Sequence, residues 1–268
     1  MSEQLEKKVM ETLKKIKLSK KDKILVAVSG GGDSSVTAYL LKKFGYNIEG
    51  IHINLGVGDY SKKCMNSAKK LCQQLGVKLH VYDLKKEQGK TMKDFWREVG
   101  EKKKLNNCAV CGVMKKWILN KEARKLKVKS IATGHNLDDE TETFLLNVLK
   151  GSLGLSSKTG IITKNTKDKK FIPRIKPLFY IHKKDIMAYA RKNKLDFVDG
   201  ICPYREDSYR IEIRKFLSTL SNKEKENLMK NAEHVLKKIK KENSKIQYCQ
   251  LCGEPSRKNI CKKCGLMR

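Results

Sequence analysis

The chain has 268 residues, of which 39% are hydrophobic, enough for one large domain or for one domain with a small appendage. It has no apolar run near the roughly 20 residues that cross a bilayer, and residues 1–20 lack an apolar core, so we expect neither a membrane span nor a signal peptide. Lys and Arg number 60 against 29 Asp and Glu, a net charge of +31. A body this positive favours a polyanionic partner, nucleic acid before an acidic membrane surface, although a Lys-rich proteome would explain part of the excess.

Taken in chain order, the apolar pattern predicts strands that alternate with helices. Residues 1–22 form a basic amphipathic helix. The strands are expected at residues 24–28, 48–53, 78–82 and 130–133, and the helices at residues 36–44, 61–75, from 91 onward, 113–126 and 137–149. This alternation predicts an α/β fold whose parallel sheet is covered by helices on both faces. Ligands in such sheets bind at the carboxyl ends of the strands.

The second half of the chain is more polar. We expect a loop at residues 158–170, an extended segment at 171–178, and helices at 182–192 and 208–220. Ser221 and Glu224 give a capping-box pattern that begins a charged helix running to about Asn243. We therefore divide the chain into an N-terminal basic helix (1–22), a main α/β domain (23–220), a charged helix (221–245) and a C-terminal ribbon (246–268).

The first predicted strand ends in a glycine-rich turn. The turn consists of Ser29, Gly30, Gly31, Gly32, Asp33, Ser34 and Ser35. Successive glycines let backbone N–H groups converge on phosphate oxygens, and the following helix adds its positive N-terminus. The Gly-Lys-Ser/Thr ending of a P-loop NTPase is absent, and a phosphate would repel Asp33 unless a Mg²⁺ ion lay between them or Asp33 positioned a catalytic group. The alternative is a tight strand-to-helix turn without a ligand.

Four cysteines close the chain in the pattern C-x2-C-x8-C-x2-C. They are Cys249, Cys252, Cys261 and Cys264. Two such pairs can surround one tetrahedral Zn²⁺ ion, and Gly253 and Gly265 permit the tight turns that aim backbone amides at sulfur. So short a segment needs a metal to fold. Because cysteines would fill all four coordination positions of the metal, we expect a structural site or a docking module rather than a catalytic one. The alternative is that the four cysteines are free.

Three further cysteines lie in two separate places, with Cys108 and Cys111 forming C-x2-C and Cys202 preceding a proline. Three thiolates can hold three irons of a [4Fe-4S] cluster and leave the fourth open for hydrosulfide. A persulfide pair, with one Cys resolving the other, is the second interpretation. A zinc site or buried thiols is the third. Cys72 fits a helical core face, and Cys64 is interpreted as incidental.

Four segments resemble known enzymes. The motif from Ser29 to Ser34 matches the S-G-G-x-D-S motif of the PP-loop ATP pyrophosphatases, which cleave ATP between the α- and β-phosphates and adenylate a substrate oxygen. The segment from Gly134 to Thr141 resembles the G-H-x-x-D-D-x-x-E-T motif of members that act on tRNA. The two cysteine segments, 108–115 and 202–204, resemble the iron–sulfur-dependent tRNA 2-thiolation enzymes of the TtcA/TtuA type.

The likeness spans residues 24–220, and the terminal ribbon is similar to that of the TtuA side. The chain departs from the TtuA type in having no Cys before Cys64, where that type usually begins with a second zinc finger. The resemblance implies a PP-loop sheet and a cytoplasmic homodimer that 2-thiolates a tRNA pyrimidine. Uridine is favoured over cytidine. ATP, Mg²⁺, a [4Fe-4S] cluster and Zn²⁺ would be the cofactors, with sulfide or a small ubiquitin-like sulfur-carrier protein as donor.

The resemblance also assigns roles to residues. Cys108, Cys111 and Cys202 would hold the cluster. The catalytic residues would be Asp33, Lys115 and Asp139. The ATP site would comprise the loop from Ser29 to Ser35 together with His52, Ile53, Gly134, His135, Asp138 and Asp139. From the residues alone, Lys115 is also compatible with a solvated helix Lys, and Asp138 and Asp139 with carboxylates that complement a helix dipole.

Three arginines follow Cys202 closely: Arg205, Arg210 and Arg214. Arg210 and Arg214 are one helical turn apart. We predict that these arginines grip tRNA phosphates near a flipped base; a plain solvated helix face is the alternative. Rival functions are another PP-loop RNA enzyme, such as a lysidine-forming or persulfide-type ligase, and a non-catalytic zinc-ribbon RNA-binding protein.

Overall fold

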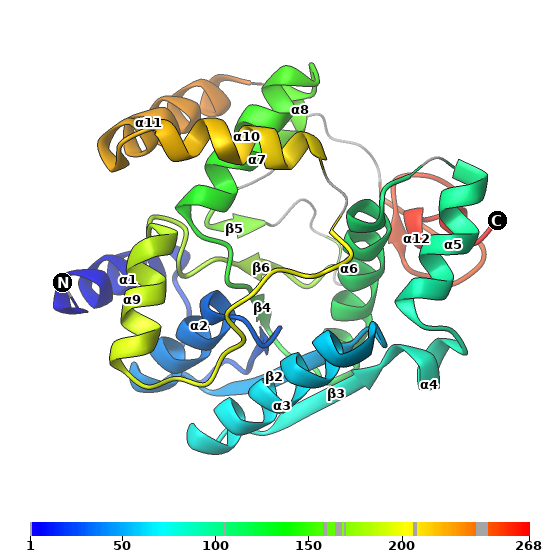
Figure 1. Ribbon diagram of the computed structural model, residues 1–268, viewed down its shortest axis with the longest axis horizontal. Coiled ribbons are helices and arrows are strands. Elements are labelled where there is room, and N and C mark those ends of the chain that lie inside the picture. Colours follow the sequence, from blue (N-terminus) through cyan, green and yellow to red (C-terminus); the bar gives the residue numbers. More distant parts are fainter. Residues whose placement is uncertain are drawn as a thin grey trace.

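The helices and strands of the chain alternate through its first half, as Figure 1 shows for the computed structural model. The structure describes residues 2–103, 105–157, 160–163, 168, 170–205, 208–239 and 246–268. The helices there are α1 (Ser2–Ile16), α2 (Gly32–Lys43), α3 (Gly58–Gln74), α4 (Leu84–Gln88), α5 (Met92–Lys103), α6 (Asn107–Lys125), α7 (Leu137–Leu149), α8 (Leu153–Ser156), α9 (Lys183–Lys192), α10 (Ser208–Thr219), α11 (Asn222–Lys238) and α12 (Lys262–Leu266). The strands are β1 (Ile24–Ala27), β2 (Ile48–Asn54), β3 (Leu79–Asp83), β4 (Ser130–Ala132), β5 (Ile162–Thr163), β6 (Arg174–Ile175), β7 (Gln247–Tyr248) and β8 (Pro255–Ser256).

Six strands form the main sheet in the order β3-β2-β1-β4-β6-β5. All neighbouring strands are parallel except β5, which pairs antiparallel with β6 at the edge. Strand β5 corrects our prediction of a loop at residues 158–170 and makes the sheet mixed; residues 158–159, 164–167 and 169 of that prediction lie outside the described residues. Strands β7 and β8 pair in the C-terminal ribbon.

Alternating residues of β1 enter two different cores, one on each face of the sheet. Ile24 and Val26 pack into the core formed with α1, α2, α3 and α9. Leu25 packs on the opposite face with residues of α6. The sheet is therefore buried on both faces, which explains why its central strand is an uninterrupted apolar run. No helix in the described ranges is long and apolar enough to cross a bilayer.

Helix α6 begins six residues earlier than the apolar pattern predicts. The side chain of Asn106 accepts a hydrogen bond from the backbone N–H of Ala109 at 2.8 Å and caps the helix. Small residues and a glycine in the first turns (Cys108, Ala109, Cys111 and Gly112) give no clear apolar periodicity there. As a result, Cys108 and Cys111 lie on the helix and share its rigidity.

Helices α7, α10 and α11 pack together in a further layer, which Figure 1 shows above strands β5 and β6. Glu142 on α7 is 1% exposed, and it accepts hydrogen bonds of 2.6 Å from Arg210 and from Arg214 on α10. Ser221 and Glu224 form the capping box that begins α11. The part of the predicted charged helix at residues 240–245 lies outside the described residues.

Substitutions on α1 can show how much the packing of this helix against the core stabilises the protein. Leu13 is 1% exposed within the α1/α2/α9 core, whereas Met10 on the same helix is 42% exposed. We expect Leu13→Ala to lower the free energy of unfolding by about 2–5 kcal/mol, because it removes buried methyl groups and leaves a cavity. Met10→Ala should change it by less than about 0.5 kcal/mol. Urea unfolding of both variants measures this, and equal effects would contradict the packing.

Candidate active site

The glycine-rich loop between β1 and α2 is held by its own polar groups. Ser34 Oγ donates to the carbonyl of Gly31 at 2.8 Å and accepts from the backbone N–H of Ser29 at 3.1 Å. Ser35 Oγ donates to the carbonyl of Asp196 at 3.0 Å. The predicted ATP-binding hydroxyls of Ser34 and Ser35 are buried and thus fix the shape of the loop.

Two glycines let neighbouring elements press against this loop. A Cβ atom on Gly134, just after β4, would lie 2.8 Å from the carbonyl carbon of Asp33 and 2.9 Å from the amide nitrogen of Ser34. Gly30 has a φ of +89°, and a Cβ atom there would lie 2.5 Å from the carbonyl oxygen of Cys64 on α3. Both positions therefore require glycine, for close approach and, at Gly30, also for its backbone conformation.

Two of the predicted catalytic carboxylates, Asp33 and Asp139, lie near each other at the carboxyl ends of β1 and β4. Asp33 accepts a hydrogen bond of 3.0 Å from the side chain of Asn136 and forms an ion pair with Lys183 on α9. Asp139 accepts from the backbone N–H of Asn136 at 3.3 Å in the capping box of α7. Desolvation, followed by the negative charge of Asp33, raises the pKa of Asp139 to about 6. The pair is therefore poised to receive a cation or a proton.

Asp138 holds helices together. Its carboxylate accepts from the backbone N–H of Lys183 at 2.7 Å and pairs with Lys225 on α11 at 3.0 Å. Its burial raises the pKa, but these two donors outweigh it and lower the pKa below the usual value. Asp138 thus links α7 to α9 and α11, while the neighbouring Asp139 faces Asp33.

The two predicted nucleotide-site histidines are neutral at pH 7. His135 is an exposed residue, and its Nδ1 lies 2.9 Å from Thr133 Oγ1. Surrounding protein and then the positive charges of Lys176 and Lys116 lower its pKa to about 3. His52 is buried, with Nδ1 2.8 Å from the carbonyl oxygen of Val28, and its burial lowers its pKa.

His52 therefore ties β2 to β1 from inside the sheet. Its neighbour Ile53 is partly buried, between the core under α6 and the core around α5. Of the two residues predicted for the adenine site, only Ile53 keeps exposed surface beyond a few per cent.

The cysteines of the central trio approach one another where residues 202–205 turn past the start of α6. Asn107 donates to the carbonyl of Tyr204 at 3.4 Å, and the Tyr204 ring packs 5.4 Å from that of Trp96, centroid to centroid. Cys108 and Cys202 are close enough to Cys111 to influence its titration. Burial raises the pKa of Cys111, while Lys115, one turn along α6, lowers it through charge and a hydrogen bond.

The thiols and the phosphate loop lie at the same edge of the sheet. The segment that leads to Cys202 crosses the loop, where the backbone N–H of Val198 donates to the carbonyl of Gly30 at 2.8 Å. Ser35 bonds to the same segment at Asp196. A nucleotide phosphate on the loop and a sulfur carried by the thiols would thus share one site.

Sequence reasoning missed two members of this site, Cys64 and Tyr60. Cys64, interpreted as incidental, packs its backbone against Gly30 and lies near Lys115, Cys202 and the hydroxyl of Tyr60. Burial raises the pKa of the Cys64 thiol and raises the pKa of Tyr60 to about 12. The helical pattern shows that Cys64 is on an inward face, but it gives no sign of what lies opposite.

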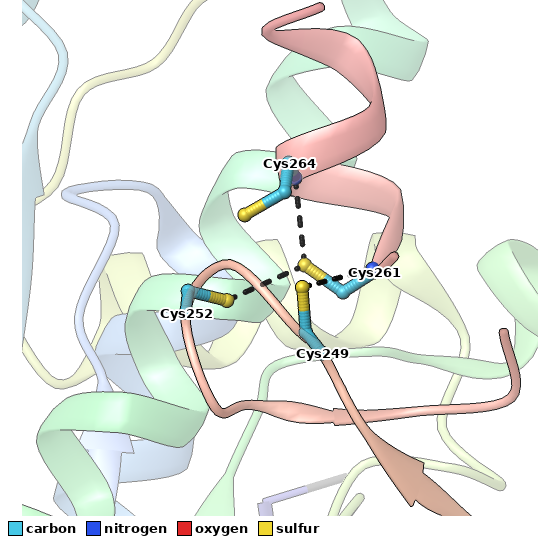
Figure 2. Close-up of side chains that lie close together, drawn as sticks. All are labelled: Cys249, Cys252, Cys261 and Cys264. Atoms are coloured by element: carbon cyan, nitrogen blue, oxygen red, sulfur yellow. Dashed lines mark hydrogen bonds between the residues drawn. The ribbon is translucent and has the colours of Figure 1, made fainter. Parts of the chain in front are cut away.

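The four terminal cysteines form one compact ligand group (Figure 2). Their sulfur atoms all lie within 4.8 Å of one another, and the backbone N–H of Cys261 donates to Cys249 Sγ at 3.2 Å. Burial raises the pKa of Cys249, but backbone amides, that of Cys261 first, outweigh it and lower the pKa. Four thiolates so placed fit one tetrahedral metal ion. Gly253 has a φ of +67°, in the left-handed region that favours glycine, whereas Gly265 lies inside α12.

The ribbon is fixed to α5 and α6. Leu266 packs into the core around these helices, and Trp117 on α6 contacts both that core and the cysteine group. Arg124 on α6 forms an ion pair with Glu254 of the ribbon. Lys103 on α5 donates to the carbonyl of Gly265 at 2.6 Å.

The three predicted tRNA-binding arginines occupy two environments. Arg205 lies in the turn after Cys202, with its backbone N–H donating to the Cys202 carbonyl at 3.2 Å. Arg210 and Arg214 hold Glu142, yet their side chains remain 33% and 47% exposed. They therefore have a structural task in addition to any contact with RNA.

Comparison with known proteins agrees with this geometry. The sequence profile of the PP-loop domain family matches residues 1–220. A tRNA-5-methyluridine(54) 2-sulfurtransferase of Pyrococcus horikoshii is 38% identical over 98% of this chain and 84% of the relative. Cytoplasmic tRNA 2-thiolation protein 1 of Caenorhabditis elegans is 32% identical over 99% of this chain and 73% of the relative.

A solved structure is similar over nearly the whole chain. The U34-tRNA thiolase NcsA of Methanococcus maripaludis, determined with its [4Fe-4S] cluster, superposes with a TM-score of 0.83 at 28% identity, covering 98% of this chain and 86% of that one. Both the sequence and the fold thus place the chain in one group. It belongs to the PP-loop domain family, among the tRNA 2-thiolation proteins.

Proposed function

We propose that this protein is a cytoplasmic ATP-dependent tRNA sulfurtransferase that replaces the C2 carbonyl oxygen of a uridine with sulfur. The observation that carries the proposal is the meeting of the phosphate loop with Cys108, Cys111, Cys202 and Lys115 at one edge of the sheet. The names of the similar proteins, two uridine thiolases among them, support the substrate. The proposed organisation of the chain is an N-terminal basic helix (1–22), a PP-loop domain (23–220), a charged helix (221–245) and a C-terminal ribbon (246–268).

The proposed reaction begins with ATP, which activates the C2 oxygen of the uridine before sulfur is transferred. The C2 oxygen attacks the α-phosphorus, an O–P bond forms, and pyrophosphate leaves. Sulfide then attacks C2, the C–O bond breaks, and the oxygen leaves with AMP. The loop amides and the N-terminus of α2 stabilise the phosphates, and Lys115 donates to the developing charge on the uracil or the phosphate.

The two carboxylates support a Mg²⁺ ion beside the ATP phosphates. Asp33 and Asp139 repel each other, and these two carboxylates would hold a divalent cation, which would relieve the repulsion and supply positive charge for the phosphates. Lys183 neutralises Asp33 in the structure through an ion pair.

The central thiols suit a [4Fe-4S] cluster. Two lie on the first turns of α6 and the third lies in a turn that is hydrogen-bonded to this helix, so these three thiolates could ligate three irons and leave the fourth without a protein ligand. When bound, the cluster would supply an iron site that activates sulfur. Zn²⁺ would occupy the terminal four cysteines. Sulfide or a small ubiquitin-like carrier protein is the donor, and the enzyme acts as a homodimer.

The function is tested by incubating the protein anaerobically with ATP, Mg²⁺, sulfide and an unmodified tRNA transcript. We expect AMP, pyrophosphate and 2-thiouridine in the tRNA, measured by nucleoside mass spectrometry. Lys115→Ala should lower the rate by at least about 100-fold, because it removes a donor to transition-state charge. Lys125→Ala, on the same helix but 75% exposed and paired with Glu122, is the matched control.

A protein that binds tRNA without releasing AMP would be a non-catalytic RNA-binding protein, and 2-thiocytidine as the product would change the substrate. Either outcome would overturn the proposal as stated.

The metal assignment makes a separate prediction. We expect about four irons and one zinc per chain, and Cys108→Ala should lose the irons and keep the zinc, because the two sites share no ligand. Cys72→Ala, in the core under α2 and α3, should keep both. Anaerobic iron, sulfide and zinc analysis measures this. An iron-free wild-type protein that still thiolates tRNA would indicate persulfide chemistry at the same cysteines.

The carboxylate pair predicts an unusual pH dependence of stability. Because the folded state raises the pKa of Asp139 to about 6, ionisation of Asp139 opposes folding, and the contribution of Asp139 to the free energy of unfolding should fall as pH rises from about 4 to 7. Asp139→Asn should equal wild type near pH 4 and exceed it near pH 7 by up to about 3 kcal/mol. Asp138→Asn should show the opposite sign at pH 7, since the folded state lowers the pKa of Asp138. Urea unfolding at both pH values, without Mg²⁺, decides this.

A further inference from the structure

Three cations gather at the junction between the main domain and the ribbon: Lys116 on α6, Arg174 on β6 and Lys262 at the start of α12. Arg174 Nη2 donates to the backbone carbonyl of Lys116 at 3.2 Å, which fixes these two side by side. Lys262 stands on the ribbon helix that packs against α6 (Figure 1). Within the described residues, none of the three forms an ion pair with a carboxylate.

Nearby cations do have acidic partners. Lys176 forms a buried ion pair of 2.6 Å with Glu140, and Arg210 pairs with Glu142. The contrast matters because these two cations are neutralised by carboxylates, whereas no carboxylate in the described part of the chain pairs with Lys116, Arg174 or Lys262. Cations crowded in this way repel one another unless an external anion lies between them.

The electrostatics agree with that arrangement. The side chain of Lys116 reaches solvent but stands among protein elements, and desolvation, followed by the charges of Arg174 and Lys262, lowers its pKa. Lys116 and Arg174 also lower the pKa of His135, beside the glycine-rich loop, after desolvation and the charge of Lys176. The cluster therefore adjoins the proposed active site without belonging to the phosphate loop or to the thiols.

We propose that the backbone phosphates of the substrate RNA bind to a single cationic site formed by Lys116, Arg174 and Lys262. Through Lys262, the four-cysteine ribbon would then contact the RNA directly beside the reacting nucleotide. This inference rests on the proposed function. Phosphates of a polyanion neutralise several cations at once, and point-charge lysines suit them without reading bases. The ribbon would then place Lys262 as well as brace α6.

The test compares tRNA affinity at several salt concentrations for Lys116→Ala, Lys262→Ala and the double variant, measured by filter binding with unmodified transcript. Each lost phosphate contact lowers the salt slope, log K against log salt, by about 0.7–0.9 and costs about five- to eightfold in affinity near 0.1 M salt. The double variant should lose about 25- to 60-fold and about 1.4–1.8 of slope. Lys125→Ala on the same helix should match wild type. Arg174 is left intact because it also holds α6.

Two controls keep the result specific. Zinc content should be unchanged in Lys262→Ala, and ATP affinity should be unchanged in all variants. If the variants bind tRNA with wild-type affinity and wild-type salt dependence, or lose only ATP affinity, the proposed phosphate site is wrong. The proposed function would still stand. A wild-type protein that does not bind tRNA would overturn both.

Discussion

The close approach of β4 to the glycine-rich loop is the constraint on which the site depends. With no side chain on Gly134, the strand end lies against the backbone of Asp33 and Ser34. That contact brings Asn136 within reach of Asp33, and Asn136 also caps α7 by accepting from the backbone N–H of Asp139. One asparagine thus begins a helix and orients a carboxylate of the neighbouring loop.

The second requirement is a loop whose shape does not depend on its ligand. The hydroxyls of Ser34 and Ser35 and the carbonyl of Gly30 are all engaged within the protein. Such a loop loses little conformational freedom when phosphate binds, because its backbone is already ordered. The segment that secures the loop, through Asp196 and Val198, continues to Cys202, so the order of the loop and the position of one thiol have a common cause.

Much of this architecture follows from local signals in the sequence. The run from Ile24, the turn that ends it and the spacing of the terminal cysteines each predict a single local structure, and each prediction agrees with the fold. Local sequence patterns do not predict an element whose formation depends on a partner that is distant in the sequence. Strand β5 is two residues long and exists only because β6 offers an edge.

The same reason explains the residues of the site that the sequence does not reveal. Arg210 and Arg214 meet Glu142, about 70 positions earlier in the chain, and no periodicity marks that pairing. Cys64 shows the pattern of a helix that packs inward, but only the folded chain brings it beside Lys115 and Cys202.

Helix α6 connects the two groups of cysteines mechanically. Its first turns carry Cys108 and Cys111, and further along Trp117 and Arg124 are held by the ribbon. Trp117 and Arg124 stand on the same continuous helix as Cys108 and Cys111, so a displacement of the ribbon would be transmitted along α6 to the turns that carry these two cysteines.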